Sequence, residues 1–341
     1  MICQRITSIY DLWLRRGLVL VLVAAGLGIA CREAAAQTAT LSWQAVMEDT
    51  AGHAEVQPVY YNIYCDTVPA FRPGPANFLA ATLNTSYVHR DARLNDPNRH
   101  LFYLVRAVDV WGNESAVSDT VGEVPYILVR ARAFLQGAYD AAGDTMRTTL
   151  QRKGLLPLTS PYIRAPRAVA ALPAGTVDWV LLQLRDPGSA NIIGEESFLI
   201  NQAGYLTELD GVNQALGMAG CAPGNYQLVL YQRNHAAVMS RDTFYCSKSA
   251  PVLHDFSADS TFYEGRNAAC PLEPAVWGLW SGDVNQDHQI SDLDFGSWQS
   301  AAKEGRSGYQ PQDLNFDGQV TSQDYILWYR AQRIGATSYV P

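Results

Sequence analysis

The sequence has none of the short motifs that mark the common catalytic sites. It contains no Gly-x-Ser-x-Gly elbow, no His-Glu-x-x-His pair and no glycine-rich phosphate loop, and no cysteine has a convincing histidine partner. Carboxylates that could act as a glycosidase pair occur in the middle of the chain, but no motif pairs them. They are Asp178, Glu195, Glu196, Glu208, Asp210 and Asp259. These absences favour a protein that is not an enzyme, with glycoside hydrolysis as the alternative.

Basic residues are also in deficit. The chain has 25 Lys and Arg against 33 Asp and Glu, a formal net charge of -8. Proteins that bind nucleic acid usually carry an excess of basic residues on one face. We therefore expect no nucleic-acid partner.

Cysteines are few, and none has the spacing of zinc ligands, because the sequence has no Cys-x-x-Cys and no suitable Cys/His pair. Two of the six cysteines lie within the first 36 residues. In an exported protein the other four, Cys65, Cys221, Cys246 and Cys270, allow three pairings. We expect one disulfide among the last three.

The N-terminal apolar run is too short to cross a membrane. Leu18 to Ala30 falls below the roughly 20 residues that a spanning helix needs, and it follows arginines as a signal-peptide core does. Small residues at 34–36 offer a cleavage site, so residues 1–36 are predicted to be a signal peptide. The mature chain is then extracellular or at the cell surface, without a transmembrane segment. Lipid anchoring through Cys31 is the alternative, although Gly28 stands where leucine is expected.

What the sequence does contain is one pattern written twice near its C-terminus, at a constant offset of 30 residues. Each copy places oxygen-bearing side chains at positions one, three, five, nine and twelve of a twelve-residue loop. A hard cation such as Ca²⁺ takes about six to eight oxygens, including a main-chain carbonyl at position seven. The predicted ligands of two calcium ions are Asp283, Asn285, Asp287, Gln289, Ser291 and Asp294, and Asp313, Asn315, Asp317, Gln319, Thr321 and Asp324. Both Gln residues contribute their main-chain carbonyl.

Position six of such a loop needs a sharp turn, for which glycine is preferred. The second loop has Gly318 there, and the first has His288. Histidine tolerates the left-handed backbone conformation better than most residues. We therefore expect both loops to bind calcium.

Aromatic residues repeat after each loop as well. Phe295 and Trp298 correspond to Tyr325 and Trp328, and their spacing places both members of a pair on one side of a helix. The repeated unit is therefore a loop followed by a helix, without the leading helix of a complete EF-hand.

Two such half-hands, each with Asp at position twelve, resemble a type I dockerin, the module by which cellulosome components dock onto cohesin domains. The resemblance covers residues 280–335. It implies two structural calcium ions and a pair of helices whose exposed face binds a cohesin-like protein. Loop positions ten and eleven often steer partner choice in that family, and here they are Asp292, Leu293, Ser322 and Gln323. Their asymmetry argues against two interchangeable binding orientations.

Residues 38–124 show short runs that alternate with period two and are separated by turn residues, which is typical of an all-β domain. The pattern Leu41-x-Trp43, Tyr61-x-Ile63 and Tyr103-x-Val105-x-Ala107, closed by Gly112 to Ser115, resembles a fibronectin type III domain. Alternation with polar neighbours predicts that Trp43 and Tyr103 pack in the core and do not form a sugar-stacking platform.

Residues 125–275 predict a second β-sandwich of jelly-roll type, because several candidate strands follow one another at short intervals. The strands are expected within 126–136, 177–184, 197–200, 205–209, 226–231 and 236–239. One polar cluster, Arg233, Asn234 and His235, lies between the last two. We expect it to be structural, with a role in a cleft as the alternative.

The whole chain is therefore predicted to be mostly β: a fibronectin type III-like sandwich and a second β-sandwich, followed by a small α-helical calcium-binding module. Its expected function is that of an exported, non-catalytic modular protein that mediates attachment or assembly at the cell surface. The alternative is a polysaccharide-degrading or carbohydrate-binding component in which the middle β domain is the active or binding module.

Overall fold

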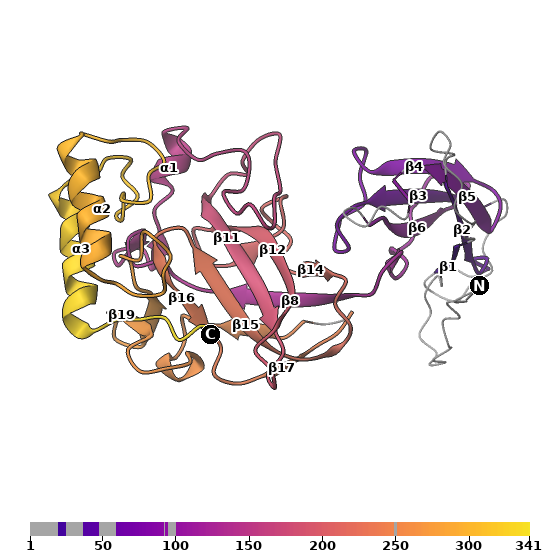
Figure 1. Cartoon of the computed structure of the whole chain (residues 1–341). Helices are drawn as coiled ribbons and strands as arrows, with labels where there is room; N and C mark the ends of the chain where they lie inside the picture. The colour runs from indigo at the N-terminus through magenta and orange to yellow at the C-terminus, as the bar shows by residue number, and fades with distance from the viewer. Residues whose placement is uncertain (1–19, 25–36, 48–58, 92, 95–99, 249–250) are drawn as a thin grey trace, which may run out of the picture. The chain divides into compact units, whose positions relative to one another are not determined.

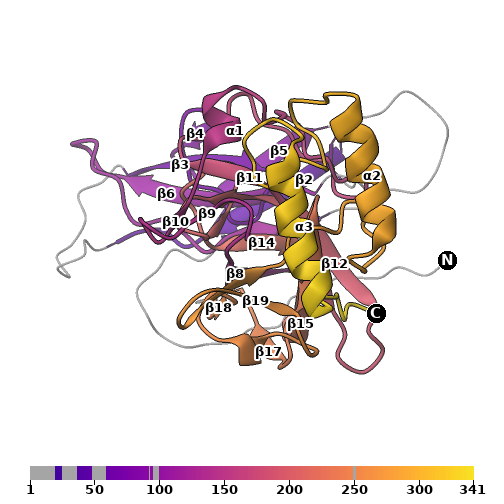
Figure 2. The same ribbon diagram turned by 90° about the vertical axis from the view of Figure 1, so that its left-hand side faces the viewer.

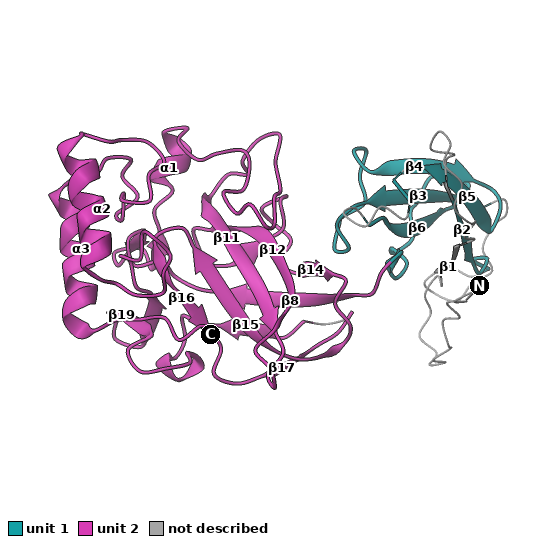
Figure 3. Ribbon diagram, in the orientation of Figure 1, with its two compact units in different colours: residues 1–123 teal, residues 124–341 magenta. Residues whose placement is uncertain are grey.

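The computed structural model describes residues 20–24, 37–47, 59–91, 93–94, 100–248 and 251–341. The chain is mostly β, as expected, and divides into two compact units, Met1–Glu123 and Val124–Pro341 (Figures 1 and 3). The calcium-type loops therefore share a unit with the middle β domain. None of the helices in the described ranges has both the length and the apolar character of a membrane span.

The first unit is a sandwich of two antiparallel sheets. One sheet has the order β1-β2-β5 and the other β4-β3-β6-β7. The strands are β1 (Leu20–Ala24), β2 (Gln37–Trp43), β3 (Tyr60–Asp66), β4 (Phe78–Thr82), β5 (Ser86–Asp91), β6 (Phe102–Val108) and β7 (Val121–Gly122). Leu41 and Trp43 of one sheet share a core with Ile63 and Tyr103 of the other. The prediction that Trp43 and Tyr103 pack inside is confirmed.

The predicted signal peptide lies outside the described residues, apart from β1. This strand pairs with β2 along its whole length, from Leu20 opposite Trp43 to Ala24 opposite Ala39. Cleavage after residue 36 would remove β1 and leave β2 paired with β5.

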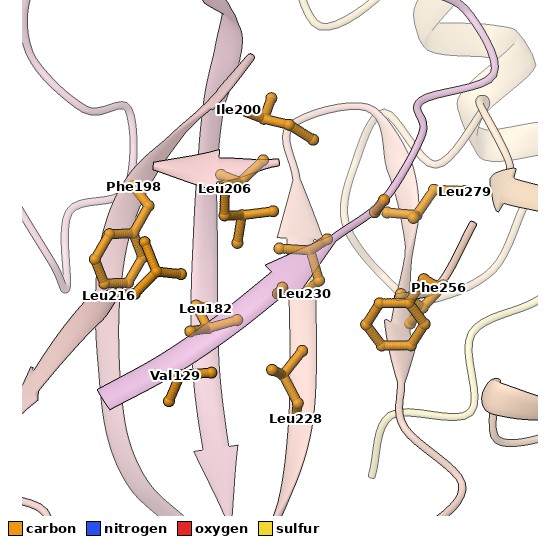
Figure 4. Packing of buried hydrophobic residues seen from close by; sticks show 14 of the residues in the cluster. Val129, Leu182, Phe198, Ile200, Leu206, Leu216, Leu228, Leu230, Phe256 and Leu279 are labelled. Atoms are coloured by element: carbon orange, nitrogen blue, oxygen red, sulfur yellow. The ribbon is translucent and has the colours of Figure 1, made fainter. Parts of the chain in front are cut away.

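The second unit is built on two further sheets that pack face to face. The larger sheet has the order β13-β12-β11-β15-β16, with β17 also paired to β15, and the smaller one has the order β14-β8-β18. Their strands are β8 (Tyr126–Arg132), β11 (Thr176–Arg185), β12 (Ile192–Asn201), β13 (Leu206–Thr207), β14 (Leu216–Ala219), β15 (Gly224–Gln232), β16 (His235–Met239), β17 (Phe244–Cys246) and β18 (Leu253–Asp255). In Figure 4, β8 crosses the larger sheet, and Val129, Leu182 and Leu228 lie in the core between them.

Short elements connect this sandwich to the C-terminal segment. They are β9 (Tyr139–Asp140), β10 (Thr145–Met146), α1 (Thr149–Arg152), the 3₁₀ turn η1 (Ser260–Phe262), β19 (Ala269–Glu273) and β20 (Val276–Leu279). Cys65, Cys221, Cys246 and Cys270 are all free thiols in this structure, so the disulfide that we expected among the last three is not formed.

Two helices, α2 (Asp292–Lys303) and α3 (Ser322–Ile334), follow the two loops and lie side by side along one edge of the second unit (Figures 1 and 2). Each begins with a capping box. Ser291 and Thr321 are the N-caps, and Asp294 and Asp324 bond back to the N-cap amides. Position twelve of each loop therefore also fixes the start of its helix.

The helices and loops are not a separate body. A second apolar cluster joins Ala236 of β16 and Trp280, which follows β20, to Leu314 and Trp328. Phe316, from the second loop, is buried in the main sandwich core. The C-terminal segment and the middle β domain thus share their apolar interior.

Candidate metal centre

The two loops have the same backbone conformation at the same positions. Position four is left-handed in both, with φ of 57° at Gln286 and 61° at Phe316. Position six is left-handed as well, with φ of 72° at His288 and 86° at Gly318. His288 therefore adopts the turn that the loop requires. Left-handed residues other than glycine cost roughly 1–2 kcal/mol each, so other contacts of the loop must hold them in place.

The side chain at position one supplies such a contact in both loops. Oδ2 of Asp283 accepts a hydrogen bond from the amide of His288 at 3.2 Å, and Oδ2 of Asp313 accepts one from Gly318 at 2.9 Å. The carboxylate thus closes the turn from inside. Its other oxygen is left for a second partner.

The side chain at position twelve ties together the two ends of each loop. Oδ2 of Asp294 accepts from the amide of Ser291 at 2.8 Å, and Oδ2 of Asp324 accepts from Thr321 at 2.7 Å. The Oδ1 atom of each also accepts from the amides at positions two and three of its own loop, at 2.7–3.3 Å. The duplication seen in the sequence therefore extends to individual hydrogen bonds.

These carboxylates are buried, with exposed fractions of 0% for Asp283, Asp313 and Asp324 and 1% for Asp294. Burial, with the charges of Asp294 and Asp287 added, raises the pKa of Asp283 to about 7. Burial likewise raises the pKa of Asp313 to about 7, against a lowering by its hydrogen bond from Gly318 and by Arg233. A buried charge is costly unless a cation compensates it.

One atom in the first loop has no partner at all. Oδ1 of Asp283 is buried and accepts no hydrogen bond, whereas Oδ1 of Asp313 accepts from the amide of Asp317 at 3.1 Å. Buried oxygens without a partner are rare. Buried carboxylates, one of them with an unpaired oxygen, beside the amide and main-chain oxygens of the same loop fit a hard divalent cation such as Ca²⁺.

Within the described ranges, no three side chains of His, Cys, Asp or Glu already converge as metal ligands do. Each predicted ligand set has only three such side chains, all of them Asp. The other ligands of each set are an Asn side chain, a Ser or Thr hydroxyl and the main-chain carbonyl of a Gln. The carboxylates of Asp294 and Asp324 are turned toward loop amides, as described above.

The two loops are held together by crossed tryptophan contacts. Nε1 of Trp298 in α2 donates to the carbonyl of Thr321 in the second loop at 3.0 Å, and Nε1 of Trp328 in α3 donates to Ser291 in the first at 3.1 Å. The ring of Phe295 lies 5.1 Å from that of Trp328. The sequence predicts that these aromatics share a helix face, but not that each indole bonds the opposite loop.

The residues expected to face a partner are on the surface. Asp292, Leu293, Ser322 and Gln323 are all exposed at the starts of the helices. Leu293 exposes 69% of its surface, an unusual fraction for a leucine. The polar cluster of Arg233, Asn234 and His235, by contrast, is buried against the loops.

The six carboxylates considered for glycoside hydrolysis each have a structural partner. Asp178, Glu195 and Glu208 form ion pairs with Arg233, Arg164 and Arg167 at 2.8–3.0 Å, while Glu196, Asp210 and Asp259 accept from main-chain amides at 2.7–2.9 Å.

The chain matches no protein-family model and no curated protein. Among solved structures it matches two mutants of a type II cohesin–X-dockerin complex from Acetivibrio cellulolyticus. The N-terminal interface mutant is 14% identical over 60% of this chain and 92% of the other, with a TM-score of 0.28. The C-terminal interface mutant is 17% identical over 44% and 78%, with a TM-score of 0.26. Both scores are too low to indicate a shared fold.

Proposed function

We propose that this chain is an exported, non-catalytic attachment protein whose C-terminal segment, residues 280–335, binds two calcium ions and docks onto a cohesin-like partner. One observation carries the calcium assignment: two loops with matching hydrogen bonds to the carboxylates at positions one and twelve hold these carboxylates buried, and in one loop a carboxylate oxygen has no partner. A bound Ca²⁺ would supply the positive charge that these carboxylates lack. The loop residues would orient the oxygens around it.

Calorimetric titration of the full chain with CaCl₂ is expected to show two bound ions. Asp287→Asn and Asp317→Asn each replace one charged ligand at position five by a neutral one of the same size. We expect each to weaken one site at least about tenfold and to leave the other site bindable, because affinity follows the charge count of the ligands.

Asp259→Asn is the matched control. Asp259 caps the short turn η1 outside both loops, so its substitution should leave both sites unchanged. A wild-type chain that takes up no calcium at millimolar concentration would overturn the assignment.

The exposed faces of the two helices differ, although their buried faces match. Helix α3 exposes Ile326 (48%) and Tyr329 (41%). Thirty residues earlier, α2 has the exposed residues Gly296 and Gln299. Apolar and aromatic side chains supply most of the binding energy at protein interfaces. The docking surface is therefore assigned to α3 together with Leu293, and it fits a partner with an apolar recess.

This assignment is tested by placing the same charge at equivalent positions of the two helices. Ile326→Asp should weaken binding at least about tenfold in calcium, whereas Gly296→Asp should change it less than about threefold. A side chain at Gly296 meets no atom within 4 Å, so that variant should fold normally. Binding of the full chain to a panel of immobilised cohesin domains, with and without EDTA, is the measurement.

Equal losses in the two variants would contradict the assignment of one docking face. A wild-type chain that binds no cohesin in calcium would remove the docking role while leaving the calcium sites untouched.

A further inference from the structure

The turn between β15 and β16 contacts the start of each calcium-type loop. In the second loop it contacts the first residue, and in the first loop it contacts the residue directly before the loop. Asn234, with an exposed fraction of 0%, lies at the centre of this turn. Its carbonyl accepts from the amide of Gly282, directly before Asp283, at 2.8 Å, and its Nδ2 donates to the carbonyl of Asp313 at 2.9 Å. A single residue is thus bonded to the beginnings of both loops.

The next residue extends the contact to the first loop. Nε2 of Gln286 donates to the carbonyls of His235 at 3.3 Å and of Asp283 at 2.7 Å. The ring of His235 in turn is fixed on both sides, with Nδ1 2.9 Å from Oδ1 of Asn234 and Nε2 3.0 Å from Oγ of Ser281. Burial lowers the pKa of His235 to about 3, so the ring is neutral and acts as a hydrogen-bonding spacer.

The preceding residue extends the contact to the second loop. Arg233 is buried, donates to the carbonyl of Gln310, and lies with its guanidinium 5.0 Å from the ring centre of Phe316. The ammonium of Lys153, from the connection after α1, donates to the carbonyl of Asp317 at 2.6 Å. Both loops are therefore anchored to the sandwich, and Asn234 is bonded to Asp313 of the second loop and to the residue directly before the first.

A calcium ion fixes the first residue of the loop that binds it. Since Asp313 and the residue before Asp283 are bonded to the same buried asparagine, ordering one loop restrains the anchor of the other. A second ion then binds to a loop that has already lost part of its freedom, which is positive coupling between the sites. We propose that Asn234 is a shared positioning residue through which filling one calcium site raises the affinity of the other. This inference rests on the proposed calcium binding.

Calorimetric titration of the full chain with CaCl₂ measures the coupling directly. The affinity of the second loop is compared between the wild type and Asp287→Asn, at calcium concentrations that leave the weakened first loop empty, and the first loop is treated in the same way with Asp317→Asn. We expect each intact site to bind about tenfold more weakly when the other is empty. When Asn234→Ala is added to each of these variants, the change in the affinity of the intact site should fall below about twofold.

Asn201→Ala is the matched control, because its side chain bonds the amides of Ala203 and Tyr205 within the turn between β12 and β13. It should leave the tenfold change in affinity intact. Circular dichroism shows whether Asn234→Ala folds. If it does not, the coupling is judged from the variants that keep Asn234, and a change in the affinity of the intact site of less than about twofold overturns the coupling. Failure of the wild type to bind calcium removes the proposed function and this inference together. Binding at two independent sites removes this inference alone.

Discussion

In EDTA at pH 8, the second unit is expected to melt about 10–20 °C below its melting temperature in millimolar calcium. Each site filled at a hundred times its dissociation constant contributes about 2.7 kcal/mol, and two sites contribute about 5 kcal/mol. For a unit of this size, about 1 kcal/mol shifts the melting temperature by roughly 2–4 °C. Because Phe316 belongs to the main core, we expect the loops and the sandwich to unfold together.

Stability should depend less on pH in calcium than in EDTA. Without calcium, the pKa values of Asp283 and Asp313 are raised from 3.8 to about 7, so the folded state holds protons that the unfolded state releases. Their contribution is fully present below pH 4 and is lost as the pH rises to about 7, at roughly 4 kcal/mol per carboxyl. Calcium needs the ionised carboxylates, so its stabilisation grows over the same range.

Scanning calorimetry at pH 5, 6, 7 and 8, with CaCl₂ or with EDTA, checks both statements. The gap between the two melting temperatures should widen toward pH 8, and in EDTA the melting temperature should fall. The double variant Asp287→Asn/Asp317→Asn is the control, because both of its sites are weakened and its melting temperature should respond less to calcium than that of the wild type. Identical curves in the two conditions would end the calcium assignment.

Much of the local structure was predictable because it depends on local patterns. The dense apolar run at 177–184 predicted the central strand, which the structure extends to Thr176–Arg185, and the aromatic spacing after each loop predicted α2 and α3. The left-handed turn at His288 followed from the loop alone. Each of these features is set by residues within a few positions of one another.

The attachment of the loops to the sandwich was not predicted, because it joins residues far apart in the chain. Two signals were present in the sequence. Phe316 stands at a loop position where the first repeat has Gln286, and a large apolar residue that breaks a repeat indicates a buried contact of that repeat alone. Asp178 stands within a dense apolar run, and a carboxylate in a buried strand requires a partner. Linear spacing could not show that the partner is Arg233.

That partner predicts the second large effect: Asp178→Ala should destabilise the second unit by about 3–5 kcal/mol. The Asp178 carboxylate accepts hydrogen bonds from Arg233 Nε at 3.0 Å, Gln232 Nε2 at 2.8 Å, the Tyr309 hydroxyl at 2.7 Å and the Trp179 amide at 2.8 Å. Its removal leaves a buried guanidinium without its counter-charge. Nη2 of Arg233 already lacks a hydrogen-bond partner, so the loss of Asp178 would leave the guanidinium poorly compensated.

Urea unfolding in calcium, followed by circular dichroism, measures this cost, with Asp242→Ala as the control. Asp242 is an exposed acid of the same unit and should change the unfolding free energy by less than about 0.5 kcal/mol. The double variant Asp178→Leu/Arg233→Met removes both charges and should recover most of the loss, because replacing a buried ion pair by apolar residues is often nearly neutral. A cost below about 1 kcal/mol for Asp178→Ala would mean that Arg233 is compensated by the acidic second loop instead. In that case the same variant should lose stability on addition of EDTA by no more than the wild type does.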